Sequence, residues 1–164
     1  MKISIIFMTT LATSCILYGC GQDATQRAAT TALTAEEANV SSKTFGDYEL
    51  HFNAISTDQL QPDIARAYNI ARSKNRAMLT LSILKSTDSL TGTSVAGTVN
   101  AKAANLTGQL KDLTLRQIRD GDAIYYVGDV SVANRETLIF DIEATPENET
   151  HKMTVRFSRQ FFTN

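Results

Sequence analysis

The sequence predicts an all-β domain, an immunoglobulin-like antiparallel β-sandwich of about seven strands with one short helix. Three observations favour this fold class. Short runs of alternating apolar and polar residues recur through residues 44–164, polar turns separate these runs, and an Asp-Gly pair joins two of them. The cysteine pair and the tryptophan of antibody domains are absent from this region, so the order of the strands stays open.

The first strand is expected at residues 45–55. One face carries Tyr48, Leu50, Phe52 and Ala54, and the positions between them are polar or charged. Because successive side chains of a strand point to opposite faces, this alternation indicates a strand with one face on the core and the other in solvent.

Residues 57–72 interrupt the strand pattern and predict a short helix at residues 63–68. Pro62 suits the first helical turn because its fixed φ and missing N–H cost nothing there. Asp63 is favourable near the positive end of the helix, and Asn69 is expected to end it in a left-handed conformation. The side chains expected to cover the end of the sandwich are Ile64, Ala67 and Tyr68.

Two further strands are predicted at residues 76–85 and 93–104. The inward positions hold Ala77, Leu79, Leu81 and Ile83 in the first of them and Val95, Val99, Ala101 and Ala103 in the second. The small side chains of the second strand indicate a close approach of the two sheets.

Residues 113–132 predict a β-hairpin, because Asp120-Gly121 between two apolar-rich runs is a strong signal for a two-residue turn. This turn pairs Leu115 with Tyr126 and places both side chains on the core face. Gly128 inside the second strand indicates a bulge or a close backbone approach.

The last two strands are expected at residues 137–145 and 153–162. Strict alternation along the second of these strands would direct Arg159 into the core. We therefore expect a bulge near Ser158 that turns Arg159 outward and brings Phe162 inward.

Residues 1–19 are typical of a bacterial export signal, with one positive charge followed by an uncharged, mostly apolar run that is short for a membrane span. The run ends in Leu17-Tyr18-Gly19-Cys20, which resembles the lipobox of bacterial lipoproteins and makes Cys20 the expected site of lipid attachment. The alternatives are a plain secretory signal and, with a weaker match, Cys15. Gly21 rather than Asp after the cysteine resembles the sorting signal for the outer membrane.

Residues 20–43 are expected to be the lipidated cysteine and a flexible tether. The segment is rich in Ala, Thr and Ser and has no aromatic residue, so it cannot bury enough apolar area to offset the entropy of ordering. Thr34 and Glu37 fit a capping box for a short helix within it.

Composition excludes several classes of function. Lys2 is the only charged residue among the first 20, which leaves 15 basic and 17 acidic side chains, so the exported chain is not a nucleic-acid-binding protein by charge. Both cysteines also lie among the first 20 residues, so the folded domain has no disulfide and no thiol nucleophile. We find no catalytic motif and assign no catalytic residue, no metal ligand and no cofactor.

One loop is dense in polar groups and is a candidate binding site for a phosphate, a carboxylate or an acidic partner. Its residues are Arg66, Arg72, Lys74, Asn75 and Arg76, and Asp120 and Asp122 are expected to pair with them if the loops share one end of the sandwich. The alternative is an ordinary solvated entry to a strand.

Tyr125 is the second candidate, because it projects from the hairpin face opposite the core. It is either an exposed aromatic platform for a sugar or a partner strand, or a side chain in ordinary cross-strand packing.

A copper site is a third possibility, since imidazole and thioether ligands suit that metal. The candidate ligands are His51, His151, Met78 and Met153, which form no cluster in the sequence.

Four segments follow one another in the order FGDYELHFNAIST, LQPDIARAYNIARSKNRAMLTLSILK, RDGDAIYYVGDVSV and VRFSRQFF. In sequence and order they resemble an exported gammaproteobacterial family, the domain of unknown function DUF4426, and the resemblance spans roughly residues 44–164. It implies export in a Gram-negative bacterium and a β-sandwich-like fold. It implies no activity and no site residue.

Together these observations favour a lipid-anchored, non-enzymatic binding or assembly module on the periplasmic side of the outer membrane, with an envelope protein as a possible partner. Two alternatives stay open. One is an envelope enzyme acting on cell-wall glycan or lipid, and the other is a periplasmic metal carrier.

Overall fold

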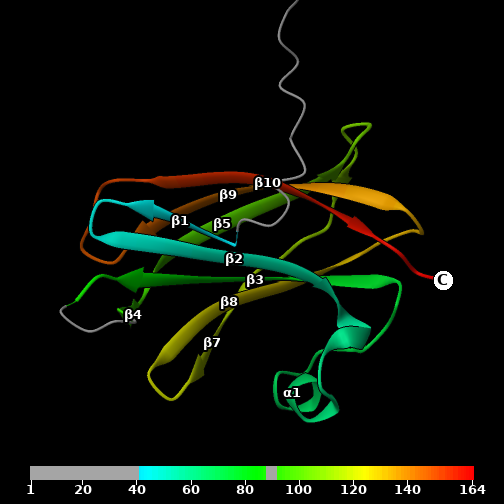
Figure 1. Cartoon of the computed structure of the whole chain (residues 1–164), viewed down its shortest axis with the longest axis horizontal. Coiled ribbons are helices and arrows are strands. Elements are labelled where there is room, and N and C mark those ends of the chain that lie inside the picture. Colours follow the sequence, from blue (N-terminus) through cyan, green and yellow to red (C-terminus); the bar gives the residue numbers. More distant parts are fainter. Residues whose placement is uncertain (1–40, 88–91) are drawn as a thin grey trace, which may run out of the picture. The chain divides into compact units, whose positions relative to one another are not determined.

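A computed structural model describes residues 41–87 and 92–164, and it confirms an all-β sandwich of two antiparallel sheets (Figure 1). Sheet A has the order β1-β2-β3-β8-β7, with β4 also pairing with β3, and sheet B has the order β10-β9-β5-β6. The strands of sheet A are β1 (Ser42–Phe45), β2 (Tyr48–Ser56), β3 (Arg76–Lys85), β4 (Thr93–Val95), β7 (Arg116–Asp120) and β8 (Ala123–Ser131). Those of sheet B are β5 (Gly97–Asn105), β6 (Leu110–Lys111), β9 (Glu136–Pro146) and β10 (Met153–Phe161).

The expected signal peptide at residues 1–19, the lipidated Cys20 and most of the tether lie outside the described residues. Within residues 41–87 and 92–164, no helix is both long enough and apolar enough to cross a membrane.

Each of the seven predicted strands is present, but the two longest predicted strands are each interrupted in the structure. The strand predicted at residues 45–55 corresponds to β2, and only Phe45 of that range belongs to β1, because Gly46 has a φ of 59° and turns the chain back on itself. The strand β1 begins at Ser42, within the segment expected to be tether. The strand predicted at residues 93–104 contains β4, which pairs with β3 in sheet A, and β5, which pairs with β9 in sheet B. The chain therefore passes from one sheet to the other at Ala96, a change that an alternating pattern does not encode.

The β7–β8 hairpin confirms the predicted faces but not the predicted register. Asp120 pairs with Ala123 and Gln117 pairs with Tyr126, so the loop is Gly121-Asp122 rather than Asp120-Gly121. Of these two loop residues only Gly121 has a positive φ, 56°, as the first position of a type II′ turn requires. A shift of two residues leaves every side chain on its face.

Gly128 marks a close backbone approach, as predicted. A Cβ atom at this position would lie 2.6 Å from the carbonyl oxygen of Thr114 and 2.8 and 3.0 Å from the side chains of Leu113 and Leu115. Both leucines pack against the main core.

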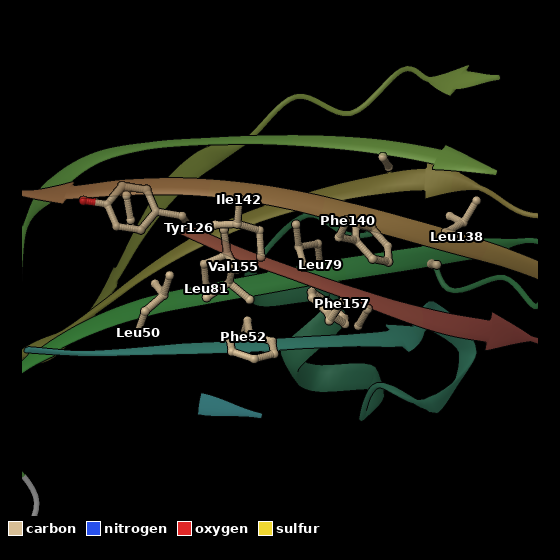
Figure 2. Packing of buried hydrophobic residues seen from close by; sticks show 14 of the residues in the cluster. Leu50, Phe52, Leu79, Leu81, Tyr126, Leu138, Phe140, Ile142, Val155 and Phe157 are labelled. Carbon is tan, nitrogen blue, oxygen red and sulfur yellow. The ribbon is translucent and has the colours of Figure 1, made fainter. Parts of the chain in front are cut away.

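The core lies between the two sheets and is apolar throughout (Figure 2). Phe140, Leu79, Leu81 and Leu138 are completely inaccessible to solvent. The ring of Phe157 lies 5.0 Å from that of Phe140 and 4.9 Å from that of Phe52, so aromatic packing joins β10, β9 and β2.

The hydroxyl of Tyr126 connects the two sheets at one end of this core (Figure 2). It donates a hydrogen bond to the carbonyl of Gly97 and accepts one from its N–H, both at 2.8 Å. The N–H of Glu147 donates a hydrogen bond to the carbonyl of Ala96. Because the backbone groups of successive residues in a strand point to alternate sides, the N–H and carbonyl of Gly97 point away from β9. On that side β6 pairs only with Ala103 and Ala104, so Tyr126 supplies the partner that no strand supplies.

The predicted bulge near Ser158 is wrong. The pairing of β10 with β9 is regular from Met153 to Phe161, so Arg159 lies opposite Leu138 on the core side of the strand. Phe161 is buried, whereas Phe162 is 62% exposed. The strand accommodates the arginine because a cleft of about 250 Å³ adjoins Arg159.

Candidate functional site

The candidate site is the outer face of sheet A, which one chain segment covers in part. This covering segment runs from Thr57 to Asn75 and contains the 3₁₀ helix η2 (Thr57–Gln59) and the helix α1 (Pro62–Ala67). Figure 1 shows α1 on the far side of sheet A from sheet B. Pro62 occupies the first helical turn, as predicted, and Asn69 is left-handed with a φ of 49°.

The covering segment packs on the face of the sheet rather than on the end of the sandwich, which corrects the expectation. Ile70 from the segment is buried with Met78 and Val127, two outward side chains of β3 and β8. Ala65 is the buried residue of α1, whereas Ile64 is 43% exposed. The reason is that this end of the outer face is apolar and gains stability from a cover.

Polar contacts hold the covering segment in two places. Thr57 is fully buried, and its hydroxyl lies 2.9 Å from the carbonyl of Ala71 and accepts a hydrogen bond from the N–H of Ser73, so the start of the segment is joined to its last part. Between them the hydroxyl of Tyr68 donates to the carboxylate of Asp120 at 2.8 Å, and Arg116 donates to the carbonyl of Tyr68. The segment is thereby tied to the β7–β8 hairpin.

The contact with Asp120 also changes the acidity of Tyr68. The hydrogen bond to that carboxylate, and then burial, raise the pKa of the Tyr68 phenol above its ordinary value. The protonated hydroxyl is thus the form that holds the segment in place.

Beside the covering segment the outer face of sheet A is open, and it forms a concavity of about 530 Å³. We call it the open groove. None of the residues that line it is an aspartate, glutamate, lysine or arginine. Its hydrogen-bonding and aromatic residues are Ser41, His51, Asn53, Thr80, Ser82, Ser94 and Tyr125.

The register explains why these side chains converge. Asn53 of β2 lies directly opposite Thr80 of β3, and His51 lies opposite Ser82, so two adjacent pairs of polar side chains form the floor. Asn53, Thr80 and Ser82 make no side-chain hydrogen bond to another described residue, whereas Ser94 accepts one from the N–H of Ile124. The floor therefore offers uncommitted donors and acceptors.

Tyr125 forms the boundary between the covered and the open parts of the face. It is partly buried and packs with the cluster beneath the covering segment, yet it also lines the open groove. The packing orients the ring and leaves one part of it available to a ligand.

One lining residue of the groove, His51, contacts a carboxylate. Nε2 of His51 is 3.3 Å from the carboxylate of Glu49. A hydrogen bond with Ser42 is the largest influence on Glu49, and together with His51 it holds the pKa of this carboxyl below its usual range although burial opposes the shift.

The predicted basic loop does not converge into one anion site. Arg66 pairs with Asp63 within α1, and Arg76 pairs with Asp129 across β3 and β8. The guanidinium of Arg72 donates to the carbonyl of Asp58 at 2.6 Å.

The remaining candidates differ in their positions. Lys74 and Asn75 are exposed, and the carbonyl of Asn75 accepts the N–H of Val132. Asp122 is exposed in the turn of the β7–β8 hairpin. Of the predicted binding residues Tyr125 lines the open groove, and so does His51, which was considered as a copper ligand.

Sequence reasoning missed Asn53, Thr80 and Ser82. The available signal was that the outward positions of residues 76–85 between the two ends hold Met78, Thr80, Ser82 and Leu84, without a charge. Outward positions of a solvated strand usually carry charges, so an uncharged series was informative.

The outer face of sheet B shows the contrast. Its concavity, about 700 Å³, is larger, but charged side chains line it, and both of its carboxylates are paired with basic side chains. Arg156 pairs with Asp141 at 2.8 Å, and Lys152 pairs with Glu143 at 3.3 Å. This is the pattern of a solvated sheet face.

The residues considered for copper do not form a site with acidic or thiol groups. Among residues 41–87 and 92–164 no three His, Cys, Asp or Glu side chains gather as metal ligands. Met78 and Met153 are buried in two different apolar clusters.

Comparison with known proteins places the chain in a family. The profile of the family described as "Domain of unknown function (DUF4426)" matches residues 42–164. A comparison with curated proteins gives no match.

The solved structures similar to this chain include the following two. A crystal structure of a DUF4426 family protein from Pseudomonas aeruginosa PAO1 shares 28% identity, covers 75% of this chain and 94% of its own, and superposes with a TM-score of 0.64. The crystal structure of FetP from uropathogenic E. coli strain F11, expressed in the periplasm of E. coli, shares 11% identity, covers 74% and 92% of the two chains, and gives a TM-score of 0.52. The second likeness concerns the fold alone. On the first likeness and the match over residues 42–164, the chain belongs to the DUF4426 family.

Proposed function

We propose that this protein is a non-enzymatic binding module of the bacterial envelope, held on a membrane by lipid on Cys20, whose open groove binds an uncharged, hydroxyl-rich ligand of the glycan class. The observation that carries this proposal is the open groove itself, a concavity of about 530 Å³ with no aspartate, glutamate, lysine or arginine in its lining.

The chemistry of the groove suits a sugar. Hydroxyl and amide side chains exchange hydrogen bonds with sugar hydroxyls in either direction, and Asn53, Thr80 and Ser82 are uncommitted within the described chain. Tyr125 adds an aromatic surface for the apolar face of a sugar ring. A charged ligand, in contrast, would enter a groove with no ionised lysine or arginine to receive it.

The rigidity of the sheet also favours binding. The floor side chains project from β2 and β3, whose opposite faces are anchored in the core by Leu50, Phe52, Leu79 and Leu81. A floor built on regular strands is largely pre-organised, so little ordering entropy opposes a ligand.

A role as an envelope enzyme has less support. An acid–base pair needs carboxyls that converge in a desolvated site. Asp141 and Glu143 instead lie on the exposed face of β9, each paired with a basic side chain.

The first test places a charge on the groove floor. We expect the full chain, purified in detergent, to bind chitohexaose, a neutral oligosaccharide, and Thr80→Arg to weaken this binding at least tenfold, which is about 1.4 kcal/mol. The arginine introduces a charge and bulk where the ligand lies, on a strand whose core face is unchanged. Isothermal titration calorimetry measures the change.

Asn100→Arg is the matched control, because Asn100 is an exposed outward residue at the equivalent face of sheet B. It should bind as the unmodified chain does. Equal binding by Thr80→Arg, or no binding of chitohexaose or of other neutral envelope oligosaccharides by the unmodified chain, would refute the groove as a glycan site.

The second test concerns the anchor. Cys20→Ser should release the protein from the membrane fraction, since each buried CH₂ of an acyl chain contributes about 0.8 kcal/mol to membrane binding. Cys15→Ser is the control and should stay in that fraction. The lipobox sequence supports this anchor, and a periplasmic location agrees with the compartment in which FetP was expressed. Immunoblotting of separated membrane and soluble fractions decides, and Cys20→Ser protein that remains with membranes would contradict the proposed anchor.

A further inference from the structure

Arg159 is in an unusual position for an arginine. It lies opposite Leu138, which is completely buried, and between Phe157 and Phe161, which are both buried on the core side of β10. Its side chain is therefore directed toward the space between the two sheets, at the edge that β10 and β2 share.

Among residues 41–87 and 92–164 this guanidinium has no hydrogen-bond partner. The Nε atom is shielded from solvent and makes no hydrogen bond, and within the described residues no carboxylate pairs with Arg159. Arg66, Arg76 and Arg156 each have a carboxylate partner. Buried donors in native proteins are almost always paired, and an unpaired one near a cleft points to a ligand.

A cleft adjoins Arg159 at this edge of the sandwich. It has a volume of about 250 Å³, and no aspartate or glutamate lines it. Its polar and aromatic lining residues are Ser56, Gln59, Arg159, Gln160, Phe161 and Phe162. Ser56 and Gln59 bring a hydroxyl and an amide toward the same space, and the exposed ring of Phe162 provides an apolar wall.

We propose that this cleft binds a carboxylate that carries an apolar group. A guanidinium presents parallel N–H donors that match the two oxygens of a carboxylate. The single positive charge in the cleft balances a monoanion, whereas a phosphate dianion would need a second cation.

The size of the cleft limits the ligand. A volume of about 250 Å³ is below the range of about 300–1,000 Å³ that is usual for drug-sized ligands. It admits one residue at the C-terminus of a polypeptide or a short free acid. Both kinds of ligand carry a carboxylate, but only the peptide C-terminus carries an amide group next to it.

The site is separate from the open groove. The groove lies on the outer face of sheet A, whereas Ser56 and Arg159 lie on the inner faces of β2 and β10. The proposal for the Arg159 cleft therefore does not depend on the glycan proposal.

Nuclear magnetic resonance tests the proposal on the full chain in detergent. The probes are N-acetylphenylalanine for a peptide C-terminus, hexanoate for a free acid, and N-acetylphenylalanine amide as the uncharged analogue. We expect the acids to shift the Nε–Hε signal of Arg159 with saturation. The amide should produce no such shift, and the tighter of the two acids identifies the source.

Three variants give the decisive comparison. Arg159→Gln should lose at least tenfold in acid affinity, measured by calorimetry. Arg156→Gln, three residues earlier on the exposed face of the same strand, should lose none. Arg159→Lys keeps the positive charge without the planar fork, so it serves if Arg159→Gln does not fold, and it should lose affinity as well.

The proposal is overturned if the amide binds as well as the acid, if neither acid binds, or if Arg159→Gln or a folded Arg159→Lys binds like the unmodified chain. Tighter binding of inorganic phosphate than of either acid would also overturn it.

Discussion

Phe140→Ala is expected to lower the free energy of unfolding by about 3–5 kcal/mol. Phe140 is completely buried at the centre of the sandwich, and its ring stacks on that of Phe157 at 5.0 Å (Figure 2). The substitution removes apolar contact area and leaves a cavity that two rigid sheets cannot close. It also removes the aromatic pair that joins β9 to β10.

Urea denaturation followed by circular dichroism measures this loss. Phe162→Ala is a matched control, because Phe162 is 62% exposed and the same atoms are removed. Its effect should stay within about 0.5 kcal/mol. A cost below about 1 kcal/mol for Phe140→Ala would show that the core repacks freely and that the described packing is wrong.

Gly97→Ala is expected to destabilise the fold by about 3 kcal/mol or more, at the upper limit of the cost usual for an overpacked core. The added Cβ would lie 2.4 Å from the carbonyl oxygen of Thr145 and 2.8 Å from the side chain of Ile83. A backbone oxygen within a regular strand cannot rotate away, so β5 must move. The movement would also break the contact between Gly97 and Tyr126.

Two variants separate these causes. Gly46→Ala adds the same atom where nothing lies within 4 Å, so only the strain of its positive φ remains, about 1–2 kcal/mol. Tyr126→Phe removes the hydrogen bonds without a steric clash and should cost about 1–3 kcal/mol. If thermal unfolding ranks Gly97→Ala as milder than Gly46→Ala, the close approach of β5 to β9 is not present in solution.

These contacts bear on binding because the core holds both proposed sites. The side chains of the groove floor project outward from strands whose inward side chains form the core. The Arg159 cleft lies at the edge of the space between the two sheets. A variant that loosens the core should therefore weaken both sites, whereas Thr80→Arg and Arg159→Gln should each affect one.

Several features of the fold could be predicted from the sequence because they depend on neighbouring residues. Alternation places side chains on faces, and all seven predicted strands are present in the structure. Pro62 begins α1 and Asn69 ends it, since backbone restrictions act within a few residues. The close approach at Gly128 was also predictable, because a strand tolerates glycine poorly without such a reason.

The hairpin register was not predictable, although its faces were. A shift of two residues moves Tyr126 from opposite Leu115 to opposite Gln117 and changes no face. A pattern with a period of two cannot distinguish these registers, and the choice depends on the turn that Gly121 makes.

The candidate site depended most on tertiary structure. The sequence by itself determined an all-β domain with alternating faces and a family, and it singled out Tyr125 as a side chain opposite the core. Only the tertiary structure decided that Asn53, Thr80 and Tyr125 share one groove, because β2, β3 and β8 are neighbours in the sheet and not in the chain.

The same reason explains the arginines. Charge in the loop was visible in the sequence, but Asp129 neutralises Arg76 from a strand that lies more than fifty residues away, as the span of their contact shows. Arg159 shows the converse, since alternation directs it inward and only the meeting of β2 and β10 creates the cleft that receives it. Local periodicity determines which way a side chain points, whereas long-range strand pairing determines what it meets there.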